Sequence, residues 1–174
     1  MTTLPIEPAR AEDAEVLSRF AAQAFTDTFA HLYDPADLGA FLATWNPPER
    51  IRAQIADPAW AIRIARGAHG EIAGFAKMGP IDFDLPPGQP AAGATELHQL
   101  YVGEAAKGTG LAAALMQWAI GWARERASIL YLSVFIENHR AQAFYRRYGF
   151  VDVGRNPFRV GNHIDEDRIW RLDL

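Results

Sequence analysis

Apolar and polar residues alternate along the first third of the chain with the spacing of helices. Val16, Leu17, Phe20, Ala24 and Phe25 recur at helical spacing, which predicts an amphipathic helix. Asp34-Pro35 and Asn46-Pro47 each read as an N-cap followed by proline at the first helical position. The pattern therefore predicts an edge strand at 4–8, confined to the edge by its two prolines, and helices at 11–28, 35–44 and 48–56.

The rest of the chain alternates β-type apolar runs with two helical segments. Gly67 to Gly70 separates two such runs and predicts a hairpin, and the prolines and glycines of 79–94 predict a loop. Strands are expected at 60–66, 71–78, 96–102, 129–136, 150–153, 158–160 and 164–172, and helices at 109–126 and 138–148, the last one ended by Gly149. This order predicts a mixed α/β domain built on one sheet.

Composition narrows the class of protein. The 174 residues, 49% hydrophobic and 22% charged, suit one globular domain over 1–174. The absence of cysteine excludes disulfides, thiolate metal sites and a cysteine nucleophile. A net charge of −4 argues against a general nucleic-acid binder. No apolar run is long enough for a membrane span and no signal peptide is visible in the first residues, so a cytoplasmic protein is expected.

The most informative segment is a glycine-rich turn between a strand and a helix. Leu100-Tyr101-Val102 runs through Gly103 to Ala106 into Lys107-Gly108-Thr109-Gly110-Leu111-Ala112. Free N–H groups at a helix start attract anions, and glycines let a phosphate approach the main chain. Lys107 adds a positive charge at the rim. The segment predicts a phosphate-binding loop, with an ordinary glycine-containing turn as the alternative.

Two nucleotide-binding patterns do not account for this loop. Gly108 to Ala113 fits the dinucleotide pattern G-x-G-x-x-A, but only 37 residues follow Glu137, too few for the second half of a doubly wound domain. The Walker pattern requires Gly-Lys-Ser or Gly-Lys-Thr, which the chain lacks.

The loop and a second motif together resemble the GNAT superfamily of N-acetyltransferases. The loop matches the family pattern Q/R-x-x-G-x-G/A except for Lys107, which keeps the charge of arginine without its forked geometry. The second motif reads Asn138-x-x-Ala141-x-x-Phe144-Tyr145-x-x-x-Gly149-Phe150. The resemblance implies a single-domain α/β fold with a mixed, mostly antiparallel sheet of six to seven strands and helices on both faces. It also implies acetyl-CoA as co-substrate, with no metal.

A narrower likeness concerns the acceptor of the acetyl group. The N-terminal Phe25-Thr26-Asp27-Thr28-Phe29 and the helix after Asp34-Pro35 resemble segments of bacterial spermidine/spermine N-acetyltransferases. The same holds for Phe158-Arg159-Val160-Gly161 and Asp167-Arg168-Ile169 near the end of the chain. A polyamine or another small amine is therefore the expected acceptor, and a homodimer is a family expectation. A protein N-terminus, a lysine side chain, an amino-bearing antibiotic and a non-catalytic acyl-CoA sensor remain alternatives.

Tyr145 is the expected general acid, since the family places its acid there. A phenol with a pKa of about 10 stays protonated at neutral pH and can donate to a thiolate with a pKa of about 8.5. Asn138 lies seven residues earlier, nearly two helical turns, and so shares a face with Tyr145. It can cap its helix and also reach the pantetheine.

The expected base is Glu96 or His98, directly or through water. Alternation along the strand predicts that Glu96, His98 and Leu100 share one face, with Leu97, Gln99 and Tyr101 on the other. An unperturbed imidazole can accept a proton near pH 7.

The remaining expected contacts to acetyl-CoA come from the main chain. Leu100, Tyr101 and Val102 are expected to hydrogen-bond the pantetheine as an extra strand would, and the loop Lys107, Gly108, Thr109, Gly110, Leu111 and Ala112 is expected to hold the phosphates. The family resemblance places a main-chain oxyanion donor at Leu100 or Tyr101.

Two further groups of residues, outside these motifs, are candidates for a metal site and for an acceptor pocket. His163, Asp165, Glu166 and Asp167 lie around the turn between the closing strands and are read as a solvated acidic loop rather than a metal site. His31, Tyr33 and Trp45 belong to the helical region where the family forms its acceptor pocket, and aromatic rings there can hold a cation.

Overall fold

The computed structural model describes residues 4–174, and its elements agree closely with the predicted order. Met1–Thr3, the start of the segment in which no signal peptide is expected, lie outside the described residues. The elements are β1 (Ile6–Pro8), η1 (Ala11–Asp13), α1 (Ala14–Phe29), η2 (Ala30–Leu32), α2 (Pro35–Trp45), α3 (Pro48–Ala56), β2 (Ala61–Arg66), β3 (Ile72–Gly79), β4 (Ala94–Val102), η3 (Glu104–Ala106), α4 (Leu111–Arg124), β5 (Ile129–Phe135), α5 (His139–Arg146), β6 (Val151–Val160) and β7 (His163–Asp173).

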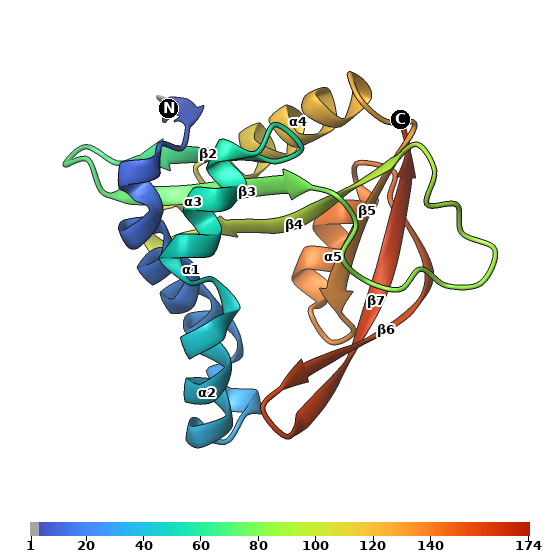
Figure 1. Cartoon of the computed structure of the whole chain (residues 1–174), viewed down its shortest axis with the longest axis horizontal. Coiled ribbons are helices and arrows are strands. Elements are labelled where there is room, and N and C mark those ends of the chain that lie inside the picture. The colour runs from blue at the N-terminus through green and yellow to red at the C-terminus, as the bar shows by residue number, and fades with distance from the viewer. Residues whose placement is uncertain (1–3) are drawn as a thin grey trace.

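One seven-stranded sheet in the order β1-β2-β3-β4-β5-β7-β6 forms the centre of the molecule (Figure 1). All neighbouring strands are antiparallel except β4 and β5, which are parallel. That pair is joined only from Ala94 to Glu96 and from Ile129 to Tyr131. Beyond these three residue pairs the strands diverge, and Figure 1 shows the sheet opening into a V at this point.

Helices cover both faces of the sheet, as the family resemblance implies. Leu111, Leu115 and Met116 of α4 pack with Leu97 and Leu130 on one face, where the side chains of α5 join the same cluster. On the other face, the main buried cluster contains residues of α1, α3, β2 and β3: Ala14, Leu17, Ala21, Ile51, Ile62, Ile64, Ile72 and Phe75. The helical repeat of apolar residues in α1 and α4 therefore decides which stripe of each helix the sheet buries.

The prediction of two strands at 150–153 and 158–160 is wrong, because β6 is continuous from Val151 to Val160. Its pairing with β7 shifts by one residue between Asp152 and Gly154, which is a β-bulge. Pro157 lies within the strand. The strand is at the sheet edge, where a residue without an N–H breaks no ladder.

One of the two predicted helix caps is also wrong. Asp34 caps α2 as expected, since its side chain accepts a hydrogen bond from the N–H of Ala36 at 2.8 Å. Helix α3, however, has Pro47 at its N-cap position and starts at Pro48. Asn46 is thereby released from capping, and its side chain turns toward β3 instead.

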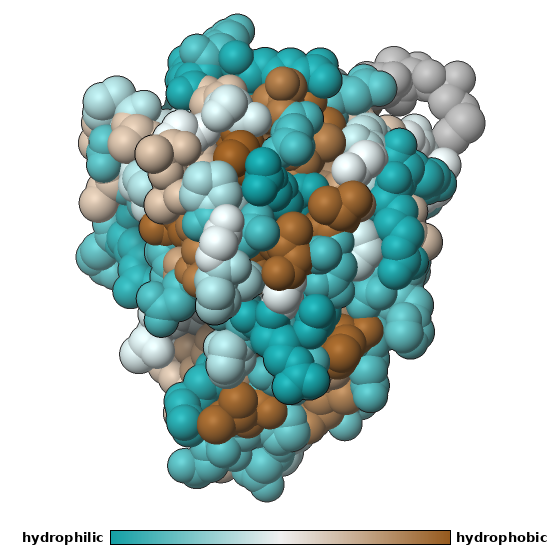
Figure 2. All heavy atoms as spheres, turned by 90° about the vertical axis from the view of Figure 1, so that its right-hand side faces the viewer, coloured by the Kyte–Doolittle hydropathy of each residue, from teal (hydrophilic) through white to brown (hydrophobic). Residues whose placement is uncertain are grey.

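The face of the molecule that carries the long loop 79–94 and β6 is mainly hydrophilic. Figure 2 shows its hydrophobic residues in small groups separated by polar ones. Among residues 4–174, no helix is both long enough and apolar enough to cross a membrane.

Candidate active site

The opening between β4 and β5 leads into a cavity of about 980 Å³. Its lining includes Leu100 to Val102 on β4, Ser133 to Phe135 on β5 and Tyr145 on α5. The sequence-predicted residues of the loop, the strand and the signature helix therefore meet in one space. We call the end formed by Leu100–Val102, Lys107, Gly108 and Gly110–Ala113 the glycine-loop side. Thr109, expected to bind the phosphates, is outside the lining, and its hydroxyl donates to the carbonyl of Ala106 at 2.7 Å.

The glycine-loop side presents main chain rather than side chains. Gly108 and Gly110 have φ angles of +78° and +90°, in the left-handed region that favours glycine. A Cβ added at either position would meet no atom within 4 Å, so the space in front of the loop is open. Gly110 is the N-cap of α4 without a side-chain cap, which leaves the first N–H groups of the helix facing that space. Lys107 is ion-paired with Glu104 at the rim.

A β-bulge in β4 overturns the predicted division of this strand into two faces. Lys77 pairs with Gln99 while the next residue, Met78, pairs with Leu97, so His98 is an extra residue in the ladder. The extra residue reverses the alternation after it. Leu100 consequently packs on the α4 face with Leu97, and it does not share the face of Glu96 and His98.

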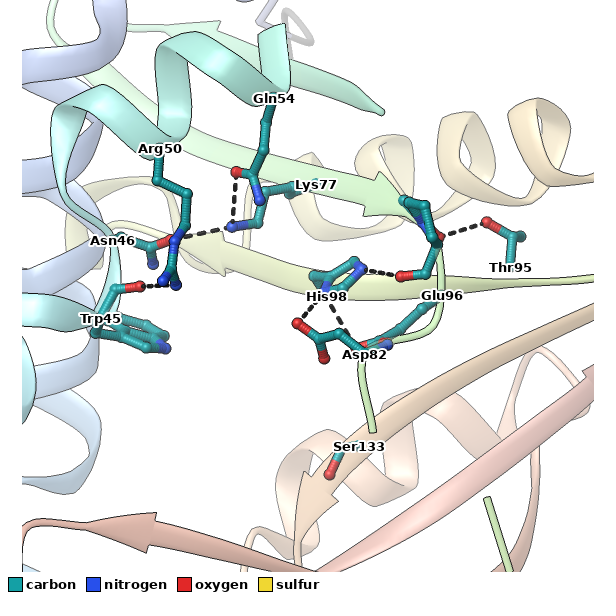
Figure 3. A network of polar contacts seen from close by, with 12 residues as sticks. Trp45, Asn46, Arg50, Gln54, Lys77, Asp82, Thr95, Glu96, His98 and Ser133 are labelled. Atoms are coloured by element: carbon teal, nitrogen blue, oxygen red, sulfur yellow. Dashed lines mark hydrogen bonds and ion pairs between the residues drawn. The ribbon is translucent and has the colours of Figure 1, made fainter. Parts of the chain in front are cut away.

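Glu96, His98 and Asp82 form a compact polar cluster on the cavity side of β4 (Figure 3). The His98 Nδ1 atom lies 3.2 Å from Glu96 Oε1 and 3.6 Å from Asp82 Oδ2, while His98 Nε2 donates to the carbonyl of Pro80 at 2.8 Å. The second oxygen of Glu96 accepts the N–H of Asp82 at 3.0 Å. Because a carbonyl can only accept, Nε2 carries a hydrogen, and Nδ1 faces the carboxylates of Glu96 and Asp82.

Burial controls the protonation of this cluster. Burial raises the pKa of Glu96 to about 8 and lowers the pKa of His98 to about 4. The prediction of an unperturbed imidazole at position 98 is therefore wrong, since both ring nitrogens are engaged and the ring is desolvated. Asp82, Glu96 and His98 each offer one possible metal-ligand atom, and these three atoms lie within 4.8 Å of one another. This is therefore where the described residues could hold a divalent cation.

Tyr145 and Asn138 lie at the other wall of the cavity, on the signature helix. Asn138 caps α5 by accepting the N–H of Ala141 at 3.1 Å, as predicted. The ring of Tyr145 packs against Phe144 and Phe150. Burial raises the pKa of Tyr145 to about 12, so the phenol is protonated over the physiological range.

Aromatic rings and two carboxylates form the opposite end of the cavity, which we call the aromatic side. Its lining residues are Phe25, Phe29, Tyr33, Trp45, Phe158, Asp165 and Asp167. Tyr33 and Trp45 therefore lie where the family resemblance places an acceptor pocket, whereas His31 is exposed and outside the lining.

The prediction that Asp165 and Asp167 belong to a solvated acidic loop is wrong. Both lie on β7 and are only 6% and 9% exposed. They alternate with the half-buried Glu166 and Arg168 and continue into the buried Ile169. The sequence signal for a strand with one face toward the cavity is the period-two spacing of Asp165, Asp167 and Ile169.

Two polar residues of the cavity were not predicted from the sequence: the buried Lys77 and Asp82 in the loop 79–94. Lys77 on β3 is 5% exposed and donates from Nζ to Asn46 Oδ1 at 3.0 Å and to Gln54 Oε1 at 3.4 Å (Figure 3). Burial lowers its pKa to about 8. A lone lysine within an apolar strand marks this position in the sequence. Asp82, by contrast, lies in a loop whose path no local pattern specifies.

Comparison with known proteins identifies the fold and the family. The profile of the acetyltransferase (GNAT) family matches residues 22–150. An uncharacterised N-acetyltransferase of Mycobacterium tuberculosis is 31% identical over 164 residues, which cover 93% of this chain and 98% of that protein. An uncharacterised N-acetyltransferase of Mycobacterium bovis matches to the same extent.

Solved structures share the whole architecture. The PaiA N-acetyltransferase of Thermoplasma acidophilum, crystallised in complex with coenzyme A, superposes with a TM-score of 0.78 at 18% identity, covering 99% of this chain and 100% of that one. A ribosomal-protein-alanine N-acetyltransferase of Brucella melitensis gives 0.68 at 23% identity, covering 98% and 100%. The fold, the family profile and the full-length relatives lead to one conclusion: the chain belongs to the acetyltransferase (GNAT) family and is an acyltransferase.

Proposed function

We propose that the protein transfers an acetyl group from acetyl-CoA to a primary amine of a small molecule, directly within a ternary complex. The observation that carries this proposal is the opening between β4 and β5, with the glycine loop at one end and the hydroxyl of Tyr145 at its wall. The open edge of β4 suits the pantetheine, and the N-terminus of α4 suits the phosphates. Asn138, at the start of α5, lies within reach of the pantetheine.

The side chains of the cleft can move both protons that the reaction requires. The amine nitrogen attacks the thioester carbonyl carbon, the carbon–sulfur bond breaks, and the sulfur leaves as a thiolate. Tyr145, kept protonated by its raised pKa, donates its proton to that sulfur. The cluster of Glu96 and His98 accepts the proton that the ammonium must lose, directly or through water. The main chain at Leu100 or Tyr101 supplies the N–H for the oxyanion.

The shape of the aromatic side favours a small acceptor over a protein. The turn between β6 and β7 is tied to α2, since Asn162 donates from its main-chain N and from Nδ2 to Asp37 Oδ1, each at 3.1 Å. Phe41 of α2 contacts Phe158 of β6 edge to face at 5.6 Å. These contacts bridge the outer end of the cavity, where a polypeptide would need an open groove. A polyamine is the acceptor class that the likeness of the terminal segments predicts.

Release of free thiol from acetyl-CoA tests this proposal. Spermidine, spermine, a lysine peptide, a peptide with a free N-terminus and an aminoglycoside would be compared side by side. Fast release with one of the polyamines supports the proposal. Release with a peptide alone overturns the small-molecule acceptor. Binding of acetyl-CoA without release on any amine, including simple alkyl diamines, overturns the enzymatic proposal and favours an acyl-CoA sensor.

A further inference from the structure

Asp167 is a buried carboxylate with one oxygen left free. It is 9% exposed, lines the cavity, and accepts a hydrogen bond at Oδ2 from Ser133 Oγ at 3.0 Å. Ser133 is itself held by Asn156, whose Nδ2 donates to its oxygen at 3.1 Å. Within the described residues no donor reaches Oδ1 of Asp167. This oxygen is not among the fully buried polar atoms without a partner, so it faces the cavity, where water or a ligand can donate to it.

The charge on this wall has no fixed positive partner among residues 4–174. Asp165 stands two residues away on the same strand, where its oxygens are engaged by the hydroxyl of Tyr33 and by His163 Nε2, the latter at 2.9 Å. No lysine or arginine forms an ion pair with either aspartate within that range. Burial, with the neighbouring charge of Asp165, raises the pKa of Asp167 to about 6, and no nearby cation lowers it.

Aromatic rings that line the same cavity as Asp167 suit a cation. Phe25 is the centre of an aromatic group in which Phe29, Tyr33 and Trp45 have ring centroids 4.8 to 6.1 Å from its own. The faces of aromatic rings attract alkylammonium ions, and a neighbouring carboxylate adds a charge-assisted hydrogen bond. None of these four rings has a lysine or arginine of the described chain over its face.

The two polar clusters of the cavity differ in charge. Glu96 and His98 on β4 are neutral at pH 7, because burial keeps Glu96 protonated and His98 unprotonated, and the pair becomes a proton acceptor as Glu96 ionises near pH 8. Asp167 is ionised at pH 7 and therefore carries a negative charge on the opposite wall. An acceptor with a single amine uses one of these sites. An acceptor with two amines can place one at the neutral pair and the other at the charged wall.

We propose that Asp167, assisted by Asp165, binds a second ammonium group of the acceptor and so makes the protein selective for diamines and polyamines over monoamines. This inference rests on the proposed function of the cavity as an amine acceptor site, and it names the residues that decide the acceptor class. The aromatic side encloses the alkyl chain between the two nitrogens.

The test compares 1,4-diaminobutane with n-butylamine, which has the same chain and lacks the second ammonium. We expect kcat/KM to favour the diamine in the unmodified protein. Asp167→Asn should lower this preference by about 10- to 100-fold, the loss of one charge-assisted hydrogen bond in a buried site, because kcat/KM falls more for the diamine than for n-butylamine. Asparagine keeps the volume and can still accept from Ser133. Asp165→Asn should lower the preference for the diamine as well, but by a smaller factor.

Glu166→Gln is the matched control, since it removes one negative charge from the same strand at a half-buried position paired with Arg155 and Arg168. Its preference for the diamine should equal that of the unmodified protein. Equal use of both amines by the unmodified protein overturns the inference without any variant. A parallel loss on both amines in Asp167→Asn also overturns it, because Asp167 would then serve the reaction or the fold.

Failure of the proposed function gives a different result. If no amine is acetylated, calorimetric titration of 1,4-diaminobutane into the protein saturated with coenzyme A still decides the inference. Binding that Asp167→Asn abolishes and Glu166→Gln retains supports it. Absent binding, or binding equal in both variants, overturns it.

Discussion

The two ends of the cavity are built from different parts of the polypeptide. The glycine-loop side presents backbone: the edge of β4, two glycines with positive φ and the N-terminus of α4. The aromatic side presents side chains that come from α1, α2, β6 and β7. Backbone recognition requires a short, contiguous segment, because its geometry is local. Side-chain recognition gathers residues as distant as Phe25 and Asp167 and allows each to vary independently.

The largest effect on turnover is expected at Tyr145, which lies between the two ends of the cavity. Tyr145→Phe should reduce kcat by about 1000-fold for every acceptor, because the leaving thiolate loses its proton donor. Binding of acetyl-CoA, measured by calorimetry, should be unchanged. Tyr148→Phe is the control, since that ring contacts Phe144 edge to face, with ring centroids 5.1 Å apart, and lies outside the cavity lining. Unchanged turnover in Tyr145→Phe would remove the hydroxyl from the mechanism.

Glu96→Gln is expected to lower kcat/KM by about 100-fold at pH 7, less than the change at Tyr145. The sign of its pH dependence follows from the raised pKa of Glu96, about 8: the ionised acceptor form of the cluster grows as pH rises through that value. The profile of kcat/KM for the unmodified protein should thus show a rise centred near pH 8, which the variant lacks. The exposed Glu125→Gln should keep it, and a variant profile that retains the rise would contradict the assignment.

Gly110→Ala tests the glycine-loop side alone. Its φ of +90° is unfavourable for alanine, and the added methyl enters the open space before the loop. We expect the KM for acetyl-CoA to rise about 10-fold and the preference among acceptors to stay constant. Gly121→Ala, in an ordinary helical position of α4 with open space around it, is the matched control and should leave KM unchanged. A change in acceptor preference in Gly110→Ala would break the separation of the two ends.

A last effect concerns the free energy of unfolding and the aromatic side. The pKa of Asp167 is raised in the folded protein, so its contribution to stability is present below pH 4 and is lost as pH rises toward 6. Asp167→Asn should therefore be more stable than the unmodified protein above pH 6, by about 1–3 kcal/mol, with the difference vanishing near pH 4. Urea unfolding at both pH values measures this, and a difference independent of pH would contradict it.

Features that depend on a short segment could be predicted from the sequence, whereas features that depend on distant segments could not. The glycine-rich turn before α4, the cap at Asn138 and the place of Tyr145 on α5 could be predicted because each depends on a few adjacent residues. The bulge at His98 could not, since it depends on how β4 pairs with β3, and it reversed the predicted face of Leu100. The environment of Asp167 depends on Ser133, in a strand 34 residues earlier, so local polarity alone suggested solvent exposure.

The three residue pairs that join β4 to β5 make the sheet incomplete on its own. Beyond Glu96 and Tyr131, each strand edge must find its hydrogen bonds in water or in a ligand. A ligand lying along β4 is then linked to folding by mass action, and a concentration one hundred times its Kd adds about 2.7 kcal/mol to the free energy of unfolding. The abundance of this protein in a cell would consequently rise and fall with the supply of acyl-CoA, through the survival of the chain as well as through its activity.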